Sequence, residues 1–209
     1  MAGLGSRLSI FPLAGALLFP RAHLPLHIFE PCYRALVTDA LARDRRIAMI
    51  QPRDGAQPPA LFDVGCVGRI AQVEALDDGR FNIVLEGLTR FRMLSEIDVT
   101  TPFRQVEASF IGFADDIEQP PLASVLRADV ERESRRFAEA RGYLVDWDAV
   151  GRLDDEALVN GIAQIAPFDV AAKQALLEVA TIAERADLVV QFMQFFRLGN
   201  EGEGRGTLQ

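Results

Sequence analysis

The sequence predicts an α+β fold in which a β-rich first half is followed by a helical second half. Before about residue 115, apolar residues alternate in short runs that are broken by Gly, Pro and Asp, which is typical of strands and turns. After the segment "ADDIEQPP" the apolar period becomes helical. An Asp78-Gly79 pair between two alternating runs adds a hairpin signal. We therefore expect two subdomains, residues 1–115 and residues 116–209, the second with a flexible C-terminal tail.

Strand predictions are strongest around residues 81–85, where "FNIVL" alternates between two faces. We expect the preceding hairpin to turn through Asp78-Gly79 in a type I′ turn, in which both central residues adopt positive φ. The alternation restarts after Glu86-Gly87, which predicts a sharp bend or bulge there. A further strand is expected around residues 103–111.

Capping residues mark the predicted helices of the second half. One helix is expected from Leu122 to about Arg141. Asp154 is expected to cap a second helix that Pro167 ends, and Asp169 to cap a third.

A last helix is predicted to begin at Thr181, which has the capping-box spacing to Glu184. Its apolar residues recur at helical spacing. The expected buried face consists of Leu188, Phe192 and Phe195 or Phe196.

The composition of the chain argues against several functional classes and cellular locations. The 209-residue chain has a net charge of −8, which argues against a broad electrostatic contact with nucleic acid. Two cysteines, Cys32 and Cys66, provide no disulfide framework, so a reducing cytoplasm is the expected location. The apolar run near the start is too short for a membrane helix, and Pro12 interrupts it as a signal peptide. We expect a cytoplasmic protein without a membrane segment.

Side chains that could bind a metal ion cluster near the start of the chain. Four potential zinc ligands fall within ten residues, but prolines exclude a helix through them, and an extended segment separates the two histidines too far to share an ion. The four are His23, His27, Glu30 and Cys32. The simpler interpretation is that Pro31 opens a helix and that Glu30 satisfies its free N–H groups.

The acidic segment "DWDAVGRLDDEA" lacks two of the ligands of a calcium loop, because Val150 and Ala157 occupy their positions. The chain also lacks a phosphate loop and a serine-hydrolase elbow. The residues therefore predict no catalytic group, no metal site and no cofactor.

Three blocks of sequence resemble the N-terminal domain of the ATP-dependent Lon protease family. They are "FPLAGALLFPRAHLPLHIFEPCYRALV", "FDVGCVGRIAQVEALDDGRFNIVLEGLTRFRM" and "PFDVAAKQALLEVATIAERADLVVQFM", in the order that the family has them. The most specific signature is "PLHIFEPCYR", which is close to the family's I-F-E-P-R-Y-R pattern. Cys32 departs from it where an arginine is usual.

The resemblance implies a PUA-like β pseudo-barrel followed by a helical bundle. It also implies that residues 8–19 form the first barrel strand, that residues 22–29 form the second, and that Pro31 opens a helix between strands. In Lon proteases an AAA+ ATPase module and a Ser-Lys peptidase domain follow this domain, and neither is expected in this chain. The resemblance is therefore to the non-catalytic, peptidase S16-like part of the family.

The function that the resemblance implies is substrate recognition in protein quality control, without enzymatic activity. The expected partners are unfolded polypeptides or polypeptides with exposed apolar segments, together with a protease or a chaperone. Self-association is left open. The peptide-binding candidates near the family motif are Phe11, Phe29, Glu30 and Tyr33.

Two alternatives from other classes remain. PUA-like folds include RNA-binding proteins, and a basic stripe including Arg45, Arg46 and Arg53 would support that function. A small-molecule enzyme with a pocket at the barrel mouth would need convergent polar groups with shifted pKa values.

Overall fold

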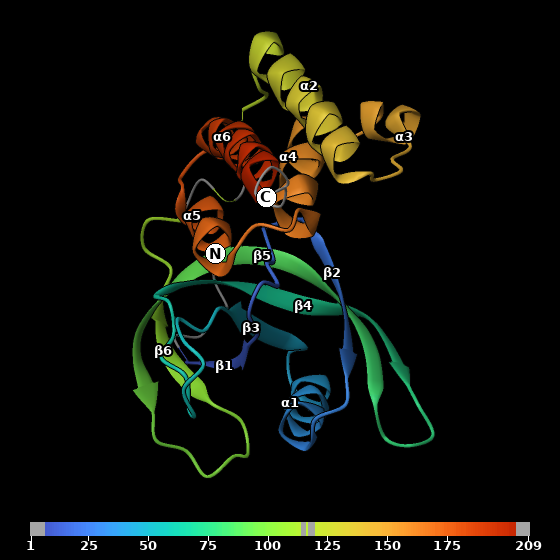
Figure 1. Ribbon diagram of the computed structural model, residues 1–209. Helices are drawn as coiled ribbons and strands as arrows, with labels where there is room; N and C mark the ends of the chain where they lie inside the picture. The colour runs from blue at the N-terminus through green and yellow to red at the C-terminus, as the bar shows by residue number, and fades with distance from the viewer. Residues whose placement is uncertain (1–6, 114–115, 117–119, 204–209) are drawn as a thin grey trace, which may run out of the picture. The chain divides into compact units, whose positions relative to one another are not determined.

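The computed structural model of the chain describes residues 7–113, 116 and 120–203, which belong to two compact units, Met1–Ile117 and Glu118–Gln209. Strands form a sheet in the first unit, and helices make up the second (Figure 1), so the predicted α+β class is confirmed. The sequence-based boundary between residues 115 and 116 stays a prediction. The expected C-terminal tail falls largely on residues 204–209, which lie outside the described part of the chain.

A closed sheet forms the first unit, called the barrel unit here (Figure 1). The strand order is β2-β5-β4-β3-β1-β6, and β6 returns to pair with β5, so that the long strand β5 closes the ring. Only β1 and β3 pair in parallel; the other pairs among the described strands are antiparallel. The elements are β1 (Arg7–Pro12), β2 (His23–Ile28), α1 (Pro31–Ala42), β3 (Arg46–Ile50), β4 (Val64–Ala75), β5 (Phe81–Ile97) and β6 (Gln105–Ser109).

The first predicted strand was too long. β1 ends at Pro12, because the chain turns at Gly15, which has a φ of +73° and donates its N–H to Gln51 Oε1 at 2.9 Å. The second strand and the helix that begins at Pro31 are confirmed. Glu30 occupies the N-cap position, but its side chain makes no capping hydrogen bond, so that part of the prediction is wrong.

The hairpin between β4 and β5 is confirmed, whereas its predicted turn type is wrong. Gly79 has a φ of +78°, but Asp78 does not adopt positive φ. Its carboxylate instead accepts the N–H of Arg80 at 3.1 Å, and Leu76 N–H donates to the Arg80 carbonyl at 2.9 Å. The Asp side chain thus stabilises a turn that needs only one left-handed residue.

The predicted bulge near Gly87 is confirmed, since the register of β4 against β5 shifts there and leaves Leu88 as the extra residue. Gly87 donates its N–H to the Ala22 carbonyl and accepts the N–H of Arg21. A Cβ atom at Gly87 would lie 1.9 Å from the Phe19 carbonyl oxygen. Only glycine allows this approach of the two backbones.

Two apolar clusters fill the barrel unit. The first joins the buried face of α1 to the sheet through Leu36, Val37 and Ala40. The second lies among strands β1, β3, β4, β5 and β6. In Figure 1 the curved strands form the wall of the barrel, and α1 lies at one end of it.

A buried ion pair ties the end of the barrel unit to β5. Asp116 accepts hydrogen bonds from the Nε and the backbone N–H of Arg90, at 2.9 and 2.7 Å, and the two side chains are only 2% and 4% exposed. Arg21 donates to the Asp116 carbonyl, and the Arg90 guanidinium lies 5.1 Å from the Phe113 ring centroid. Removing one partner of such a pair leaves the other as an unpaired buried charge.

The second unit, called the helical unit here, consists of helices alone among its described residues. Helix α6 packs against α2, α4 and α5, and the short α3 lies beside the C-terminal end of α2 (Figure 1). The helices are α2 (Ser124–Arg141), α3 (Trp147–Gly151), α4 (Asp155–Ile165), α5 (Val170–Glu178) and α6 (Ile182–Glu203). None of the described helices is long and apolar enough to cross a membrane.

The predicted N-caps are confirmed. Asp154 and Asp169 each accept the N–H of the residue three positions later, both at 2.7 Å. Thr181 and Glu184 form the expected reciprocal capping box.

The predicted buried face of the last helix is wrong. Phe195 is 70% exposed, and Leu188, Phe192 and Phe196 are half-buried. The small residue Ala186 is fully buried. The buried apolar face consists of Ile182, Ala186, Val189 and Met193.

Candidate functional site

The four peptide-binding candidates from the sequence do not form one surface. Phe11 is buried, and its ring centroid lies 4.0 Å from that of the half-buried Tyr33. Tyr33 donates its hydroxyl to the Pro12 carbonyl at 3.4 Å, and desolvation by burial raises its pKa. Phe29 and Glu30 are exposed, and Phe29 stacks on His27. The aromatic pair therefore packs in the barrel unit, whereas the other two residues lie at the surface between β2 and α1.

The potential zinc ligands do not assemble. His27 Nδ1 lies 2.7 Å from Asn82 Oδ1, and its Nε2 lies 3.2 Å from an Arg80 nitrogen, so both ring nitrogens have protein partners. Across the described residues, no three His, Cys, Asp or Glu side chains come close enough to hold a metal ion.

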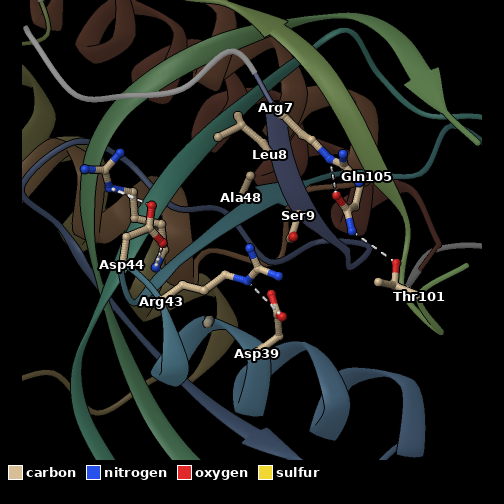
Figure 2. A pocket seen from close by; sticks show the side chains of 11 residues that line it. Arg7, Leu8, Ser9, Asp39, Arg43, Asp44, Ala48, Thr101 and Gln105 are labelled. Carbon is tan, nitrogen blue, oxygen red and sulfur yellow. Dashed lines mark hydrogen bonds and ion pairs between the residues drawn. The ribbon is translucent and has the colours of Figure 1, made fainter. Parts of the chain in front are cut away.

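A polar cavity of about 510 Å³ lies beside β1, the end of α1 and the start of β3. Figure 2 shows Arg7 directed at Gln105, with Nε 2.6 Å from Oε1. Four of the five charged side chains that line the cavity form ion pairs, Arg43 with Asp39 at 2.9 Å and Arg46 with Asp44 at 3.5 Å, whereas Arg7 is held by the neutral Gln105. A single guanidinium does not supply the convergent acid and base groups that a small-molecule enzyme needs, which weakens that alternative.

The three arginines considered for RNA binding do not form a free basic stripe. Arg46 is paired with Asp44, and Arg53 lies 3.0 Å from Asp63. Arg45 is exposed. Two of the three positive charges are thus compensated locally.

An open apolar groove with a volume of about 240 Å³ lies within the helical unit. Its lining comes from α2, α3, α4 and α6 and from the segment between α2 and α3. The buried floor consists of Ser134, Phe137, Ala138, Leu158, Ala166 and Met193. Its most exposed lining residues are Tyr143 at 49%, Val145 at 37%, Leu153 at 41% and Ile165 at 84%.

One wall of the groove is positioned by the end of α2. Gly142 adopts a φ of +69°, and the Tyr143 N–H then donates to the Ala138 carbonyl at 2.9 Å, which is a left-handed helix stop. Asp146 caps α3 by accepting the Ala149 N–H at 2.9 Å. These two signals hold the chain between the helices against α2.

Trp147 and Gly161 both line the groove. The Arg135 guanidinium lies 4.5 Å from the Trp147 ring centroid, a cation–π contact that orients the indole. Gly161 lines the groove from α4, and a Cβ atom there would meet no other atom within 4 Å. The groove thus includes a helical position at which a side chain has open space.

Titratable groups with shifted pKa values in the helical unit hold helices together. Lys173 donates from Nζ to the Gln164 carbonyl at 2.8 Å, and desolvation by burial lowers its pKa. Asp155 accepts from Arg127 at 2.6 Å and from the Leu122 N–H at 2.8 Å, and these hydrogen bonds lower its pKa. Neither arrangement aims a reactive group into the groove.

The sequence carries only a weak signal for the groove. The available signal was the segment "GYLVDW", in which apolar residues dominate a connection between helices. Connections are usually polar and lie at the surface. An apolar connection therefore indicates either burial or a binding surface.

Comparison with known proteins identifies the family. Residues 7–194 match the substrate-binding domain of the ATP-dependent protease La (LON). The chain belongs to this family. The resemblance stated from the sequence is therefore confirmed.

Among curated proteins, the Lon protease 2 of Thermus thermophilus is 26% identical over 192 residues, which cover 88% of this chain and 24% of that protein. The Lon protease 2 of Sorangium cellulosum is 30% identical over 196 residues, which cover 87% of this chain and 24% of that protein. The chain thus spans about a quarter of the length of these relatives, and the match is confined to the Lon substrate-binding domain.

Solved structures agree on the fold. The crystal structure of a Lon N-terminal domain protein from Xanthomonas campestris superposes with a TM-score of 0.66 at 20% identity and covers 90% of this chain. The N-terminal domain of the Mycobacterium avium complex Lon protease gives the same TM-score at 17% identity. Each match covers 98% of the other chain, so the fold of the Lon N-terminal domain is common to all three.

Proposed function

We propose that this Lon substrate-binding domain is a non-catalytic recognition module that binds polypeptide segments with exposed apolar side chains, as part of protein quality control. The observation that carries the proposal is the open apolar groove of the helical unit. Its exposed lining residues Tyr143, Leu153 and Ile165 lie around a buried apolar floor. Clustered apolar exposure of this kind marks interaction surfaces in proteins.

The size of the groove suits one or two apolar side chains rather than a folded partner. Burying one Leu, Ile or Phe side chain contributes roughly 1.5–3 kcal/mol. A Kd of 1 μM corresponds to a net binding free energy of about 8 kcal/mol, which exceeds the roughly 3–6 kcal/mol that two such side chains contribute before the cost of ordering the segment. Recognition would therefore be weak and tolerant of sequence, which suits a module that must bind many non-native chains.

The exposed corner of Phe29 and Glu30 is proposed as an additional contact surface. Phe29 is 59% exposed, and its ring stacks on that of His27 with the centroids 6.1 Å apart. The corresponding partners are unfolded polypeptides and a protease or chaperone that receives them. A Phe29→Ala variant that binds unfolded protein with wild-type affinity would remove this corner from the proposal.

The test uses Trp147, the single tryptophan of the chain, as a reporter in the groove. A tryptophan-free unfolded protein is titrated against wild type and against Gly161→Leu, in which the new side chain fills the groove. The native form of the same protein and an RNA oligomer serve as parallel ligands. We expect weak binding of the unfolded form alone, with a Kd of about 0.1–1 mM, a loss of at least tenfold in Gly161→Leu, and an undiminished melting temperature for that variant.

Equal binding by Gly161→Leu would exclude the groove as the site. Binding of RNA alone, with an affinity that falls steeply as salt rises, would favour the RNA-binding alternative.

A further inference from the structure

We propose that the groove selects apolar segments that are flanked by lysine or arginine and discriminates against segments flanked by acidic residues. This inference rests on the proposed function and specifies its substrate class. The occupant is a polypeptide segment with an apolar centre and basic flanks. Three features of charge and exposure support it.

Negative charge is concentrated on the helical unit. Residues 118–209 contain 16 acidic and ten basic side chains, so this unit carries −6 of the chain's net charge of −8. A segment that approaches the groove therefore meets a negative potential, which attracts basic partners and repels acidic ones.

Acidic residues also border the groove directly. Asp146, Asp148 and Asp154 are exposed, and each adjoins a lining residue in the chain, since Val145, Trp147 and Leu153 all line the groove. Asp146 and Asp154 each accept one backbone N–H as helix caps and remain exposed to solvent. Asp148 lies in the first turn of α3.

The neighbouring cations do not balance these carboxylates. Asp155 in this segment is paired with Arg127, and on α2 Arg132 and Arg136 are engaged by Asp129 and Glu133. Arg135 keeps its charge over the Trp147 ring, Arg141 lies over the Phe137 ring, and Arg152 is exposed. The exposed carboxylates beside the lining, which are Glu139 and the three named above, outnumber these three cations by one, so the border keeps a small net negative charge.

The apolar lining and the acidic border contribute to binding in different ways. Apolar burial in the groove depends little on the sign of the flanking charges, whereas the acidic border adds an attraction that depends on salt. Two basic flanks should bind about tenfold more tightly than two acidic flanks at low ionic strength, because charge complementarity acts mainly on partner choice. The difference should diminish at high salt.

The experiment uses three tryptophan-free peptides with the same leucine-rich centre and with flanks of lysine, serine or glutamate. Each is titrated against the full chain at low and high salt, with Trp147 emission as the readout. We expect affinities in the order lysine, serine, glutamate, with at least a tenfold span at low salt. Asp148→Lys should reduce this span several-fold, whereas Asp187→Lys, an equal change of charge at an exposed position of α6, should leave it nearly unchanged.

Several results would overturn the proposal. Equal affinities for the three peptides would remove charge selection while leaving apolar binding, and with it the proposed function, intact. An equal response to Asp148→Lys and Asp187→Lys would assign the selection to overall charge rather than to the border of the groove. Selectivity that persists in Gly161→Leu would place it elsewhere on the chain.

Two further outcomes are distinguishable. Binding of none of the peptides at any salt would count against the proposed function as well as against charge selection. A wild-type dimer that dissociates in Gly161→Leu, measured by sedimentation, would show that a second copy of the chain occupies the groove and would overturn the proposed occupant.

Discussion

The barrel unit and the helical unit differ in how much of their apolar lining is covered. In the barrel unit, strands and α1 cover two apolar clusters, and four of the five charged side chains that line the polar cavity beside β1 form ion pairs. In the helical unit, a groove remains open between α2, α3 and α4, with Ile165 84% exposed on its border. The first unit therefore has filled apolar clusters, and the second has the open groove on which the proposed apolar recognition rests.

Topology explains the difference. A closed sheet satisfies its backbone within the ring and directs alternate side chains inward, so its interior is filled. Helices satisfy their backbones internally and pack by their side chains alone. A short helix such as α3 therefore need not pack closely against its neighbours, and apolar side chains beside it can remain exposed.

The largest effect is expected from Asp116→Ala in the barrel unit. The variant leaves Arg90 as a buried charge without its carboxylate, which should cost about 3–5 kcal/mol of the free energy of unfolding. Denaturant unfolding measures it. Asp63→Ala breaks the exposed pair with Arg53 and should cost less than about 1 kcal/mol. Similar losses for the two variants would show that burial of the Arg90–Asp116 pair has no special importance.

Gly→Ala substitutions should lower the stability of the protein in the barrel unit and raise it in the helical unit. Gly87→Ala places a Cβ atom against the Phe19 carbonyl and should destabilise the protein by about 1–3 kcal/mol. Gly161→Ala meets open space in α4 and should stabilise it by about 0.5–1 kcal/mol through helix propensity. Thermal unfolding of both variants is the measurement. A stabilising Gly87→Ala would contradict the close backbone approach at that position.

A matched pair of exposed apolar residues tests the groove without changing the fold. Ile165→Gln removes an apolar side chain from the border of the groove, and Val125→Gln removes one that is 75% exposed on α2 outside it. We expect the first to weaken binding of an apolar peptide about fivefold and the second to leave it unchanged, since surface substitutions alter stability by only about 0.5 kcal/mol. Equal effects on the two affinities would indicate that binding does not depend on the groove.

The smallest expected effect is the pH dependence of the helical unit. Hydrogen bonds from Arg127 and from the Leu122 N–H hold the pKa of Asp155 below its ordinary value of 3.8. A lowered pKa in the folded state contributes stability above the ordinary pKa, which is lost as the pH falls through the folded value. Wild type should thus lose about 0.5–1 kcal/mol of stability below about pH 4 that Asp155→Asn does not lose. Parallel pH profiles of the two proteins would contradict this.

The sequence predicted much of the local structure, because capping and turn chemistry act between neighbouring residues. Asp154, Asp169 and Thr181 were identified as caps, and the bulge near Gly87 was anticipated from a break in alternation. The turn at Asp78 was assigned the wrong type, since a side-chain hydrogen bond to Arg80 replaced the second left-handed residue.

Most of the candidate site could not be predicted from the sequence. Phe11 and Tyr33 were selected beside a family motif, but sequence proximity does not show that their rings pack together in the barrel unit. The groove brings Tyr143, Trp147 and Ile165 together from three parts of the helical unit. Its open space at Gly161 depends on how the surrounding helices pack, which no local pattern encodes.

The sequence by itself determined the α+β class, the family and the caps of three helices, because periodicity, caps and motifs are local properties of the chain, but it did not reveal the short helix α3. Only the tertiary structure decided which apolar residues are buried and which line an open groove. That distinction depends on the approach of segments distant in the chain, as where Gly87 admits the backbone of Phe19 and where α3 leaves Trp147 beside Arg135.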